Sequence, residues 1–348
     1  MKEKVAIILA AGVSSRMNTR LPKVLHEVGG RPMLAHVLRA CRAVNISRIL
    51  VVVGFGADQV KDCYADAQDI FWVEQREQRG TGHAVLCCRD HLREFSGDTM
   101  ILCGDGPLIR AETLKTLIEK HDSENSKATL ATALLEEPSG YGRIVRDSHG
   151  SIQGIVEHSD CTAEQLEIKE VNPSYYLFDN QLLFSLLAQV KPDNVKQELY
   201  LTDAVSGAIS LGHRVLAVRA VRPEEAMGVN SRAQLSVVSK IMQRRIQKEL
   251  MDKGVTIVDP DNTWIEAAVE IGLDTVIEPF TYIHCDVEIG ERCHIGPFAN
   301  VTEGTVLEND VTLGVFVESG SVVSQRTGDE MGDEVKSAKQ IGGGEALG

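Results

Sequence analysis

The stretch Val5-Ala6-Ile7-Ile8-Leu9-Ala10-Ala11-Gly12 decides how the first part of the chain is interpreted. An uninterrupted apolar run that ends in small residues is typical of a strand buried on both faces of a parallel sheet. Residues 49–54 and 100–105 repeat this pattern, and residues 33–44 between the first two runs have the apolar spacing of an amphipathic helix. This alternation predicts an α/β, Rossmann-like doubly wound domain with its ligands at the carboxyl ends of the strands.

A six-residue period replaces this pattern in the last third of the chain. Nine positions at a strict spacing of six are aliphatic, and the positions two before each are small or β-branched. The nine aliphatic positions are Ile265, Ile271, Ile277, Ile283, Ile289, Ile295, Val301, Leu307 and Leu313. This period is neither helical nor a simple alternation, and it predicts a hexapeptide-repeat parallel β-helix in which the aliphatic side chains stack inward.

The change of period suggests how the chain is divided. We predict the α/β domain over residues 1–230, and a charged amphipathic linker helix over 231–254. The β-helix is expected over 255–325. Residues 326–348 have little apolar content and predict a disordered tail.

Composition excludes several classes of protein. The 348 residues carry a formal charge of −14, which is unfavourable for a nucleic-acid binder that follows phosphates with clustered Lys and Arg. No apolar run approaches the roughly 20 residues that span a bilayer, and the opening run is too short for a signal peptide. The eight cysteines form no C-x-x-C pair and are expected to be reduced thiols. We therefore expect a soluble, cytoplasmic protein.

The loop after the first strand carries the clearest chemical signal. A small-residue turn at this place lets backbone N–H groups approach a polyphosphate. Arg16 can form forked hydrogen bonds with phosphate oxygens, and Lys23 adds a compact positive charge. The glycine spacing of the dinucleotide fingerprint and the Gly-Lys-Ser/Thr ending of a Walker loop are both missing. The alternative interpretation is a tight strand–helix turn with two solvated cations.

These residues also carry a family resemblance. Residues 9–17 with Pro22-Lys23 resemble the signature of sugar-1-phosphate nucleotidyltransferases, and more closely that of the bacterial N-acetylglucosamine-1-phosphate uridyltransferases, the GlmU family. Further matching segments come in the family's order: Gln75 with residues 80–84, then 104–108, 140–144, 154–158, 198–203 and 228–230. The resemblance covers about residues 4 to 320. It implies that the β-helix is left-handed and assembles the protein as a homotrimer.

The activity that the resemblance implies joins UTP to N-acetylglucosamine 1-phosphate, forming UDP-N-acetylglucosamine and pyrophosphate with Mg²⁺. By resemblance, the catalytic cations are Arg16 and Lys23, and the metal ligands are Asp105 and Asn230. The residues implied for the nucleotide are Leu9, Ala10, Ala11, Gly12, Gln75, Gly80 and Thr81. Those implied for the sugar are Gly142, Glu157, Asn172 and Thr202. A lone carboxylate after a buried strand suits Mg²⁺, and an amide such as Gln75 presents both a donor and an acceptor to a pyrimidine.

The sequence departs from the family pattern at several points. Ser14 stands where the family usually has Gly, Gly106 replaces an aliphatic residue beside the expected metal ligand, and Pro173 comes directly after Asn172. The hexapeptide pattern ends near Val323, and residues 319–321 are Ser-Gly-Ser where bifunctional members have lysines. We therefore expect no acetyltransferase activity.

Three other interpretations stay open. The protein could act on another sugar 1-phosphate or nucleotide, or it could be a hexapeptide acyltransferase whose first domain is inactive. It could also be a scaffold that binds UDP-sugars without turnover. For His83 and His158 a structural role is favoured over that of a general base.

Overall fold

The computed structural model describes residues 2–13, 15–192, 194–314 and 318–319. Contacts within the chain divide it into two units, residues 1–239 and 240–348. The division falls inside helix α8 (Arg232–Asp252), which occupies most of the predicted linker helix at 231–254. The predicted tail, residues 326–348, lies outside the described residues, as does the predicted β-helix beyond residue 319.

The first unit is built on a mixed, nine-stranded sheet. Its strands are β1 (Lys4–Ala10), β4 (Ile49–Val53), β5 (Ile70–Glu74), β6 (Asp98–Cys103), β7 (Ala128–Leu134), β8 (Gly142–Arg146), β9 (Ile152–Val156), β10 (Glu170–Asp179) and β11 (Val215–Val218). The path runs β11-β7-β10-β6-β1-β4-β5, with β8 paired to β10 and β9. The strands β6, β1, β4 and β5 are parallel, whereas β10 lies antiparallel between β6 and β7. A short pair, β2 (Glu27–Val28) and β3 (Arg31–Pro32), stands apart from this sheet.

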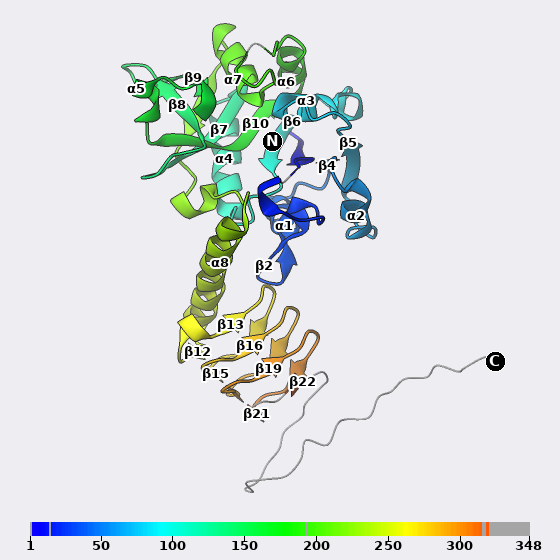
Figure 1. The fold of residues 1–348 in the computed structure, drawn as a ribbon, viewed down its shortest axis with the longest axis vertical. Coiled ribbons are helices and arrows are strands. Elements are labelled where there is room, and N and C mark those ends of the chain that lie inside the picture. The colour runs from blue at the N-terminus through cyan, green and yellow to red at the C-terminus, as the bar shows by residue number, and fades with distance from the viewer. Residues whose placement is uncertain (1, 14, 193, 315–317, 320–348) are drawn as a thin grey trace, which may run out of the picture. The chain divides into compact units, whose positions relative to one another are not determined.

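Helices cover both faces of this sheet (Figure 1). They are α1 (Met33–Ala43), α2 (Ala57–Asp62), α3 (Thr81–Leu86), α4 (Ala111–Ser123), α5 (Ala163–Leu166), α6 (Asn180–Leu187) and α7 (Leu201–Ser210). The 3₁₀ turns are η1 (Ser15–Met17), η2 (Lys23–Leu25), η3 (Arg89–Leu92), η4 (His158–Asp160) and η5 (Pro223–Ala226). Alternate residues of β1 enter two separate cores: Ile8 packs with α1 and α4, and Ile7 packs with α3, α6 and α7. The Rossmann-like α/β fold is therefore confirmed.

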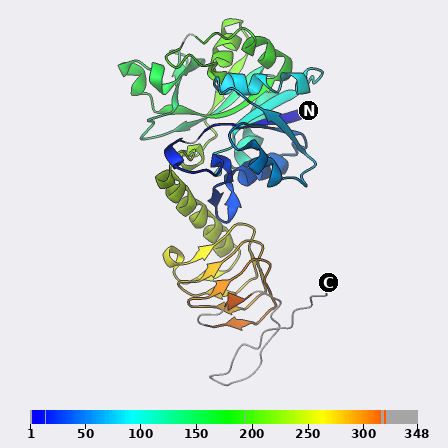
Figure 2. The ribbon, with the colours of Figure 1, turned by 45° about the vertical axis from the view of Figure 1, so that its right-hand side comes forward.

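The second unit is a stack of short parallel strands (Figure 2). They are β12 (Thr256–Ile257), β13 (Trp264–Ile265), β14 (Glu270–Ile271), β15 (Val276–Ile277), β16 (Tyr282–Ile283), β17 (Glu288–Ile289), β18 (His294–Ile295), β19 (Asn300–Val301), β20 (Val306–Leu307), β21 (Thr312–Leu313) and β22 (Glu318–Ser319), with the turn η6 (Pro260–Asn262) after β12. Each strand from β12 to β19 pairs with the third strand after it, as Ile265 of β13 does with Ile283 of β16. All nine predicted aliphatic positions are buried, so the hexapeptide β-helix is confirmed.

The second half of α8 closes the first coil of this stack. The side-chain amide of Gln243 donates to the carbonyl of Ile265 at 2.6 Å and accepts from the Ile265 N–H at 2.9 Å. The amide of Gln247 donates to the carbonyls of Pro260 and Thr263, each at 2.8 Å. Both glutamines are buried, so the backbone groups at this edge are satisfied by side chains instead of a further strand.

In the part of the chain that the structure describes, no helix is both long enough and apolar enough to cross a membrane.

Candidate active site

A cavity of about 310 Å³ opens at the carboxyl ends of β1 and β6. It is lined by Leu9, Ala10, Ala11, Gly12, Lys23, Val24, Gln75, Gln78, Gly80, Thr81, Ala84, Cys103, Asp105 and Glu198. All seven residues expected to hold the nucleotide are in this set, together with one expected cation and one expected metal ligand. The structure thus gathers segments that are far apart in the sequence around one space at the edge where α/β domains bind their ligands.

The two expected metal ligands converge on one cation, the ammonium of Lys23. The ammonium of Lys23 pairs with the carboxylate of Asp105 and donates to the Asn230 amide oxygen at 3.1 Å. Asp105 lies just after the end of β6, and its backbone carbonyl accepts from the N–H of Val229 at 3.0 Å, which ties the two segments together. Two protein oxygens that face one point match the donor set of Mg²⁺, which takes its remaining ligands from water and phosphates. The residues present therefore fit a magnesium ion.

Gly106, which departs from the family pattern, lies against Tyr175. A Cβ at this glycine would stand 3.1 Å from the Tyr175 hydroxyl, closer than ordinary contacts allow. That hydroxyl in turn donates to the carbonyl of Glu225 at 2.8 Å. The space that an aliphatic side chain would need beside Asp105 is thus taken by a buried, hydrogen-bonded tyrosine.

Arg16 is not brought to the cavity with Lys23. It lies on η1, is exposed, and has no ion-pair partner among the described residues. The turn itself is held by Arg232 at the start of α8, whose guanidinium contacts the carbonyl of Met17 at 3.3 Å. Ser14, the residue of this loop that departs from the family pattern, lies outside the described residues.

The segment after β5 is clamped onto the chain before α7. The N–H of Gly82 donates to the carbonyl of Leu199 at 2.8 Å, and the Thr81 hydroxyl accepts from the N–H of Leu201 at 3.1 Å. A Cβ at Gly80, where φ is +103°, would stand 2.6 Å from the Leu199 carbonyl oxygen. Only glycine fits this close approach, so any other residue at this position would displace the wall of the cavity.

Two polar residues that line the cavity could not be found from the sequence pattern alone. Gln78 is exposed, and its amide donates to the carbonyl of Ala11 at 2.9 Å, so that it joins the loop after β5 to the loop after β1. Glu198 lies on the segment before α7. Gln78 lies between Gln75 and the matching residues 80–84, and Glu198 is the first residue of the matching segment 198–203, so the family resemblance was the one signal that could have found them.

The residues expected to contact the sugar form two groups. Glu157 and Thr202 line a pocket of about 260 Å³, where the Thr202 hydroxyl donates to Glu157 at 3.2 Å. Gly142 lies beside them, since a Cβ there would stand 3.5 Å from the Glu157 carboxylate. Burial raises the pKa of Glu157, and the hydrogen bond from Thr202 only partly offsets this.

Asn172 is instead engaged within its own strand. Its amide donates to the Tyr176 hydroxyl at 2.5 Å, and its oxygen accepts from the N–H of Ser174 at 3.1 Å. Pro173 and Ser174 lie where the pairing of β10 with β7 shifts register, and Ser174 has a φ of +66°. The change from the family pattern therefore coincides with an irregular turn that occupies the polar atoms of Asn172.

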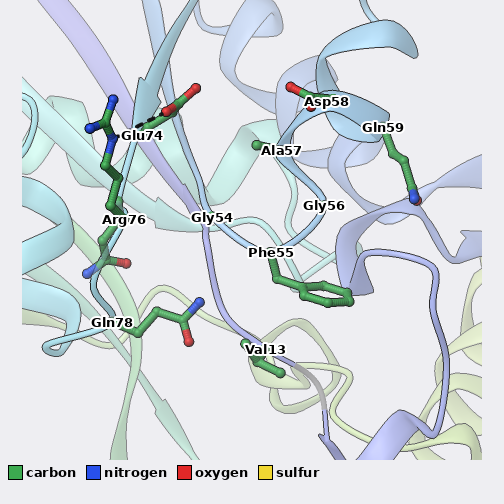
Figure 3. Close-up of a pocket in the computed structure, with 11 residues that line it drawn as sticks. Val13, Gly54, Phe55, Gly56, Ala57, Asp58, Gln59, Glu74, Arg76 and Gln78 are labelled. Carbon is green, nitrogen blue, oxygen red and sulfur yellow. Dashed lines mark ion pairs between the residues drawn. The ribbon is translucent and has the colours of Figure 1, made fainter.

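A second cavity, of about 590 Å³, adjoins the first (Figure 3). The loop after β4, which holds Phe55, lies opposite the segment with Glu74 and Arg76, which pair at 3.8 Å. Gln75 and Gln78 belong to the walls of both cavities. Nothing in the sequence pattern indicated this space.

Comparisons with known proteins agree with this geometry. The MobA-like NTP transferase domain family matches residues 6–226, and the bacterial transferase hexapeptide family matches residues 268–303. The "Bifunctional protein GlmU" of Geobacillus sp. (strain WCH70) is 42% identical over 97% of this chain and 75% of its own length. The protein of the same name from Listeria welshimeri is 40% identical over 95% of this chain and 71% of its own length. Among solved structures, that of UDP-glucose pyrophosphorylase complexed with UDP-glucose has a TM-score of 0.58 at 17% identity, covering 70% of this chain and all of the other.

The fold and the site define a protein of the nucleotidyltransferase class that carries a hexapeptide β-helix after its α/β domain. The similarity to the solved structure shows the fold alone, because the identity is low. The much closer relatives show more: the chain belongs to the GlmU family.

Proposed function

We propose that this protein is a Mg²⁺-dependent uridylyltransferase that joins UTP to N-acetylglucosamine 1-phosphate, forming UDP-N-acetylglucosamine and pyrophosphate. One observation carries the proposal: Lys23, Asp105 and Asn230 meet at the cavity that the loop after β1 lines. Family membership and the pocket with Glu157 and Thr202 support it further. A magnesium ion, when bound, supplies positive charge to the triphosphate oxygens.

The reaction needs positioning and charge more than a protein nucleophile. A phosphate oxygen of the sugar phosphate attacks the α-phosphorus of UTP, and the bond from that phosphorus to the leaving pyrophosphate breaks. Lys23 would stabilise the negative charge on the leaving group, and Arg16 remains the second proposed cation because its exposed guanidinium is not committed to a carboxylate among the described residues. The N–H groups of the loop after β1 would hold the phosphates without a change of shape.

The test is pyrophosphate release from a matrix of nucleoside triphosphates and sugar 1-phosphates with Mg²⁺. We expect the largest kcat/KM for UTP with N-acetylglucosamine 1-phosphate. Turnover confined to another pair would transfer the proposal to that sugar or nucleotide. Binding of UDP-N-acetylglucosamine without release of pyrophosphate for any pair would favour the scaffold interpretation.

The Glu157 carboxylate gives a pH-dependent prediction. Ionised Glu157 accepts hydrogen bonds from sugar hydroxyls, and burial raises its pKa, so we expect kcat/KM for the sugar phosphate to fall as the pH drops through a value above the ordinary Glu range. Glu157→Gln should remove this acid limb and raise KM for the sugar phosphate by roughly 10- to 100-fold, the cost of one charged hydrogen bond. KM for UTP should change by less than about twofold, because the pocket with Glu157 shares no lining residue with the nucleotide cavity.

Glu164→Gln is the matched control for Glu157. Glu164 is an exposed carboxylate on the nearby short helix α5, and its substitution should leave both KM values unchanged. An unaltered acid limb in Glu157→Gln would remove Glu157 from the proposed sugar site.

We further propose that the 348-residue chain does not transfer acetyl groups, and that its β-helix serves to assemble a homotrimer. The chain spans 71–75% of the length of the two relatives described above, both of which are named bifunctional. Residues 255–314 contain twelve Asp and Glu but only one Lys or Arg, Arg292, which is paired with Asp310 and Glu291. Such a surface repels the phosphates of coenzyme A.

Incubation with acetyl-coenzyme A and glucosamine 1-phosphate tests this prediction. We expect no release of free thiol above the rate without protein, in the same preparation that releases pyrophosphate from UTP. Saturable thiol release that depends on glucosamine 1-phosphate would contradict it.

A further inference from the structure

Gln75 and His83 form a polar pair in the wall of the nucleotide cavity. Gln75 lies just after the end of β5 and is almost fully buried, with 4% of its surface exposed. His83 is the third residue of α3. The side-chain nitrogen of Gln75 lies 3.1 Å from the carbonyl oxygen of Gly80 and 3.1 Å from Nδ1 of His83.

These two contacts fix the orientation of the Gln75 amide. A side-chain amide nitrogen has two hydrogens, and here both are directed to protein acceptors. The carbonyl of Gly80 can only accept, and Nδ1 of His83 accepts when the imidazole proton is on Nε2. The amide oxygen is therefore the group left for a ligand, and within the described residues no donor contacts it.

We propose that His83 is a positioning residue that holds the oxygen of Gln75 toward the base, and thereby makes the site select uracil over cytosine. This inference rests on the proposed function in one respect, that a pyrimidine nucleotide occupies this cavity. His83 itself acts through Gln75 and does not touch the reacting phosphates.

The selection arises from the edges of the two bases. Uracil has an N–H at position 3 between two carbonyl oxygens, so an oxygen acceptor forms a hydrogen bond with it. Cytosine has a lone pair at position 3. This lone pair and an oxygen acceptor repel each other, and both are left without a hydrogen-bond donor. Sites built to pair with one hydrogen-bonding group discriminate strongly against an analogue that lacks it, because the buried partner loses its bond.

The surrounding backbone keeps His83 in place. The glycines on either side of Thr81 approach the chain before α7 too closely for any Cβ, at 2.6 Å for Gly80 and 2.9 Å for Gly82. Since the first turn of α3 cannot shift without breaking these contacts, the imidazole is held against Gln75 by the fold itself. A rotated amide would place its oxygen against the Gly80 carbonyl, which is unfavourable.

Binding of Mg-UTP and Mg-CTP, measured by titration calorimetry, tests the inference on the full chain. Wild type should prefer UTP. His83→Phe keeps the ring volume and removes the acceptor, and it should lower the UTP/CTP affinity ratio by about five- to tenfold, the effect of one hydrogen bond. His83→Asn restores an acceptor at the δ position and should recover most of the ratio. His83→Ala provides a second removal of the acceptor if the phenylalanine variant does not fold.

A double-mutant cycle separates positioning from a general structural role. If His83 acts through Gln75, His83→Phe should cause no further change in the ratio once Gln75→Ala is present. The control is His91→Phe, since His91 is an exposed histidine on η3 and its substitution should not alter the ratio. An unchanged ratio in both His83→Phe and His83→Ala, additive effects in the cycle, or a wild type without preference for UTP would each overturn the inference.

The test is independent of turnover. A protein that binds UTP in preference to CTP and responds to these substitutions, yet releases no pyrophosphate, would support the inference and contradict the proposed activity. A protein that releases pyrophosphate with an unchanged ratio would do the reverse.

Discussion

Asp105→Asn should lower the rate of pyrophosphate release by about 10²- to 10³-fold while the protein remains folded. The substitution preserves the shape of the side chain but removes the charge that pairs with Lys23 and that would hold the cation. Losses of this size are typical when one group that stabilises transition-state charge is removed. Rates measured at rising Mg²⁺ concentration should show a larger half-saturating concentration in the variant than in wild type.

Asp90→Asn is a suitable control, because Asp90 is an exposed carboxylate on η3 and its removal makes the same change in net charge.

Lys23→Met should also lower the rate of pyrophosphate release strongly, but its effect on Mg²⁺ binding should differ from that of Asp105→Asn. It removes the cation that contacts both Asp105 and Asn230 and leaves the two oxygens in place, so binding of Mg²⁺ without nucleotide should not weaken. Full activity of Asp105→Asn, or of wild type in excess chelator, would contradict the proposed metal site.

The sequence predicted the second unit more completely than the first. In a hexapeptide β-helix the inward positions recur at a constant spacing, so the local pattern specifies both the core and the pairing, as the register of Ile265 with Ile283 shows. The direction of β10 was not predictable in this way. Its residues 170–179 are buried on both faces, as a parallel strand would be, and only the tertiary structure places it antiparallel beside β6.

The candidate site was predicted where the chemical groups come directly after a strand. The loop after β1 and Asp105 after β6 could be placed from local sequence, because buried parallel strands bring the residues after their carboxyl ends to one edge of the sheet. Asn230 lies 125 residues after Asp105, and only the family resemblance brought the two together. For His83 the sequence favoured a structural role, because nothing in the pattern indicates that its Nδ1 faces Gln75.

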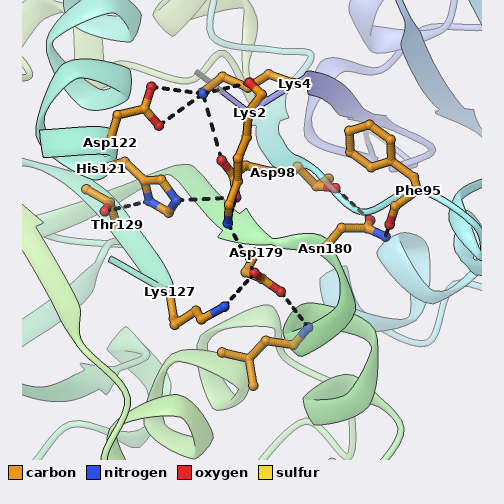
Figure 4. Close-up of polar contacts among 12 residues, drawn as sticks. Lys2, Lys4, Phe95, Asp98, His121, Asp122, Lys127, Thr129, Asp179 and Asn180 are labelled. Atoms are coloured by element: carbon orange, nitrogen blue, oxygen red, sulfur yellow. Dashed lines mark hydrogen bonds and ion pairs between the residues drawn. The ribbon is translucent and has the colours of Figure 1, made fainter. Parts of the chain in front are cut away.

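Removal of the Asp98 carboxylate should cause the largest loss of stability. Asp98 begins β6, at the end of the sheet opposite the cavity, and is fully buried. It accepts from Lys2 at 3.2 Å, and it lies 3.8 Å from the ammonium of Lys4 and 3.6 Å from Nε2 of His121 (Figure 4). Asp98→Ala would leave the partly buried Lys4 and the buried His121 without this partner, and we expect the free energy of unfolding to fall by about 3–5 kcal/mol.

Asp122→Ala is a matched control for this prediction. Asp122 contacts the same Lys4 ammonium at 3.1 Å but is partly exposed, so its loss should cost about 1 kcal/mol or less. Urea unfolding of both variants at neutral pH, with activity measured at 25 °C, compares them directly. Both should retain pyrophosphate release where folded, and equal destabilisation would show that burial of Asp98 adds nothing.

The same carboxylate should make the wild-type protein sensitive to acid. Burial alone would raise the pKa of Asp98, but His121 and Lys2 outweigh this and hold it below the ordinary value. A carboxyl group whose pKa is lowered by folding contributes its full stability above the pKa of the unfolded chain, about 3.9, and loses it as the pH falls through the folded value. The free energy of unfolding, measured from pH 7 downward, should therefore fall more steeply below about pH 4 in wild type than in Asp98→Asn, because the variant has no titrating carboxyl group at this position. Parallel curves for the two proteins would mean that folding does not lower the pKa of Asp98.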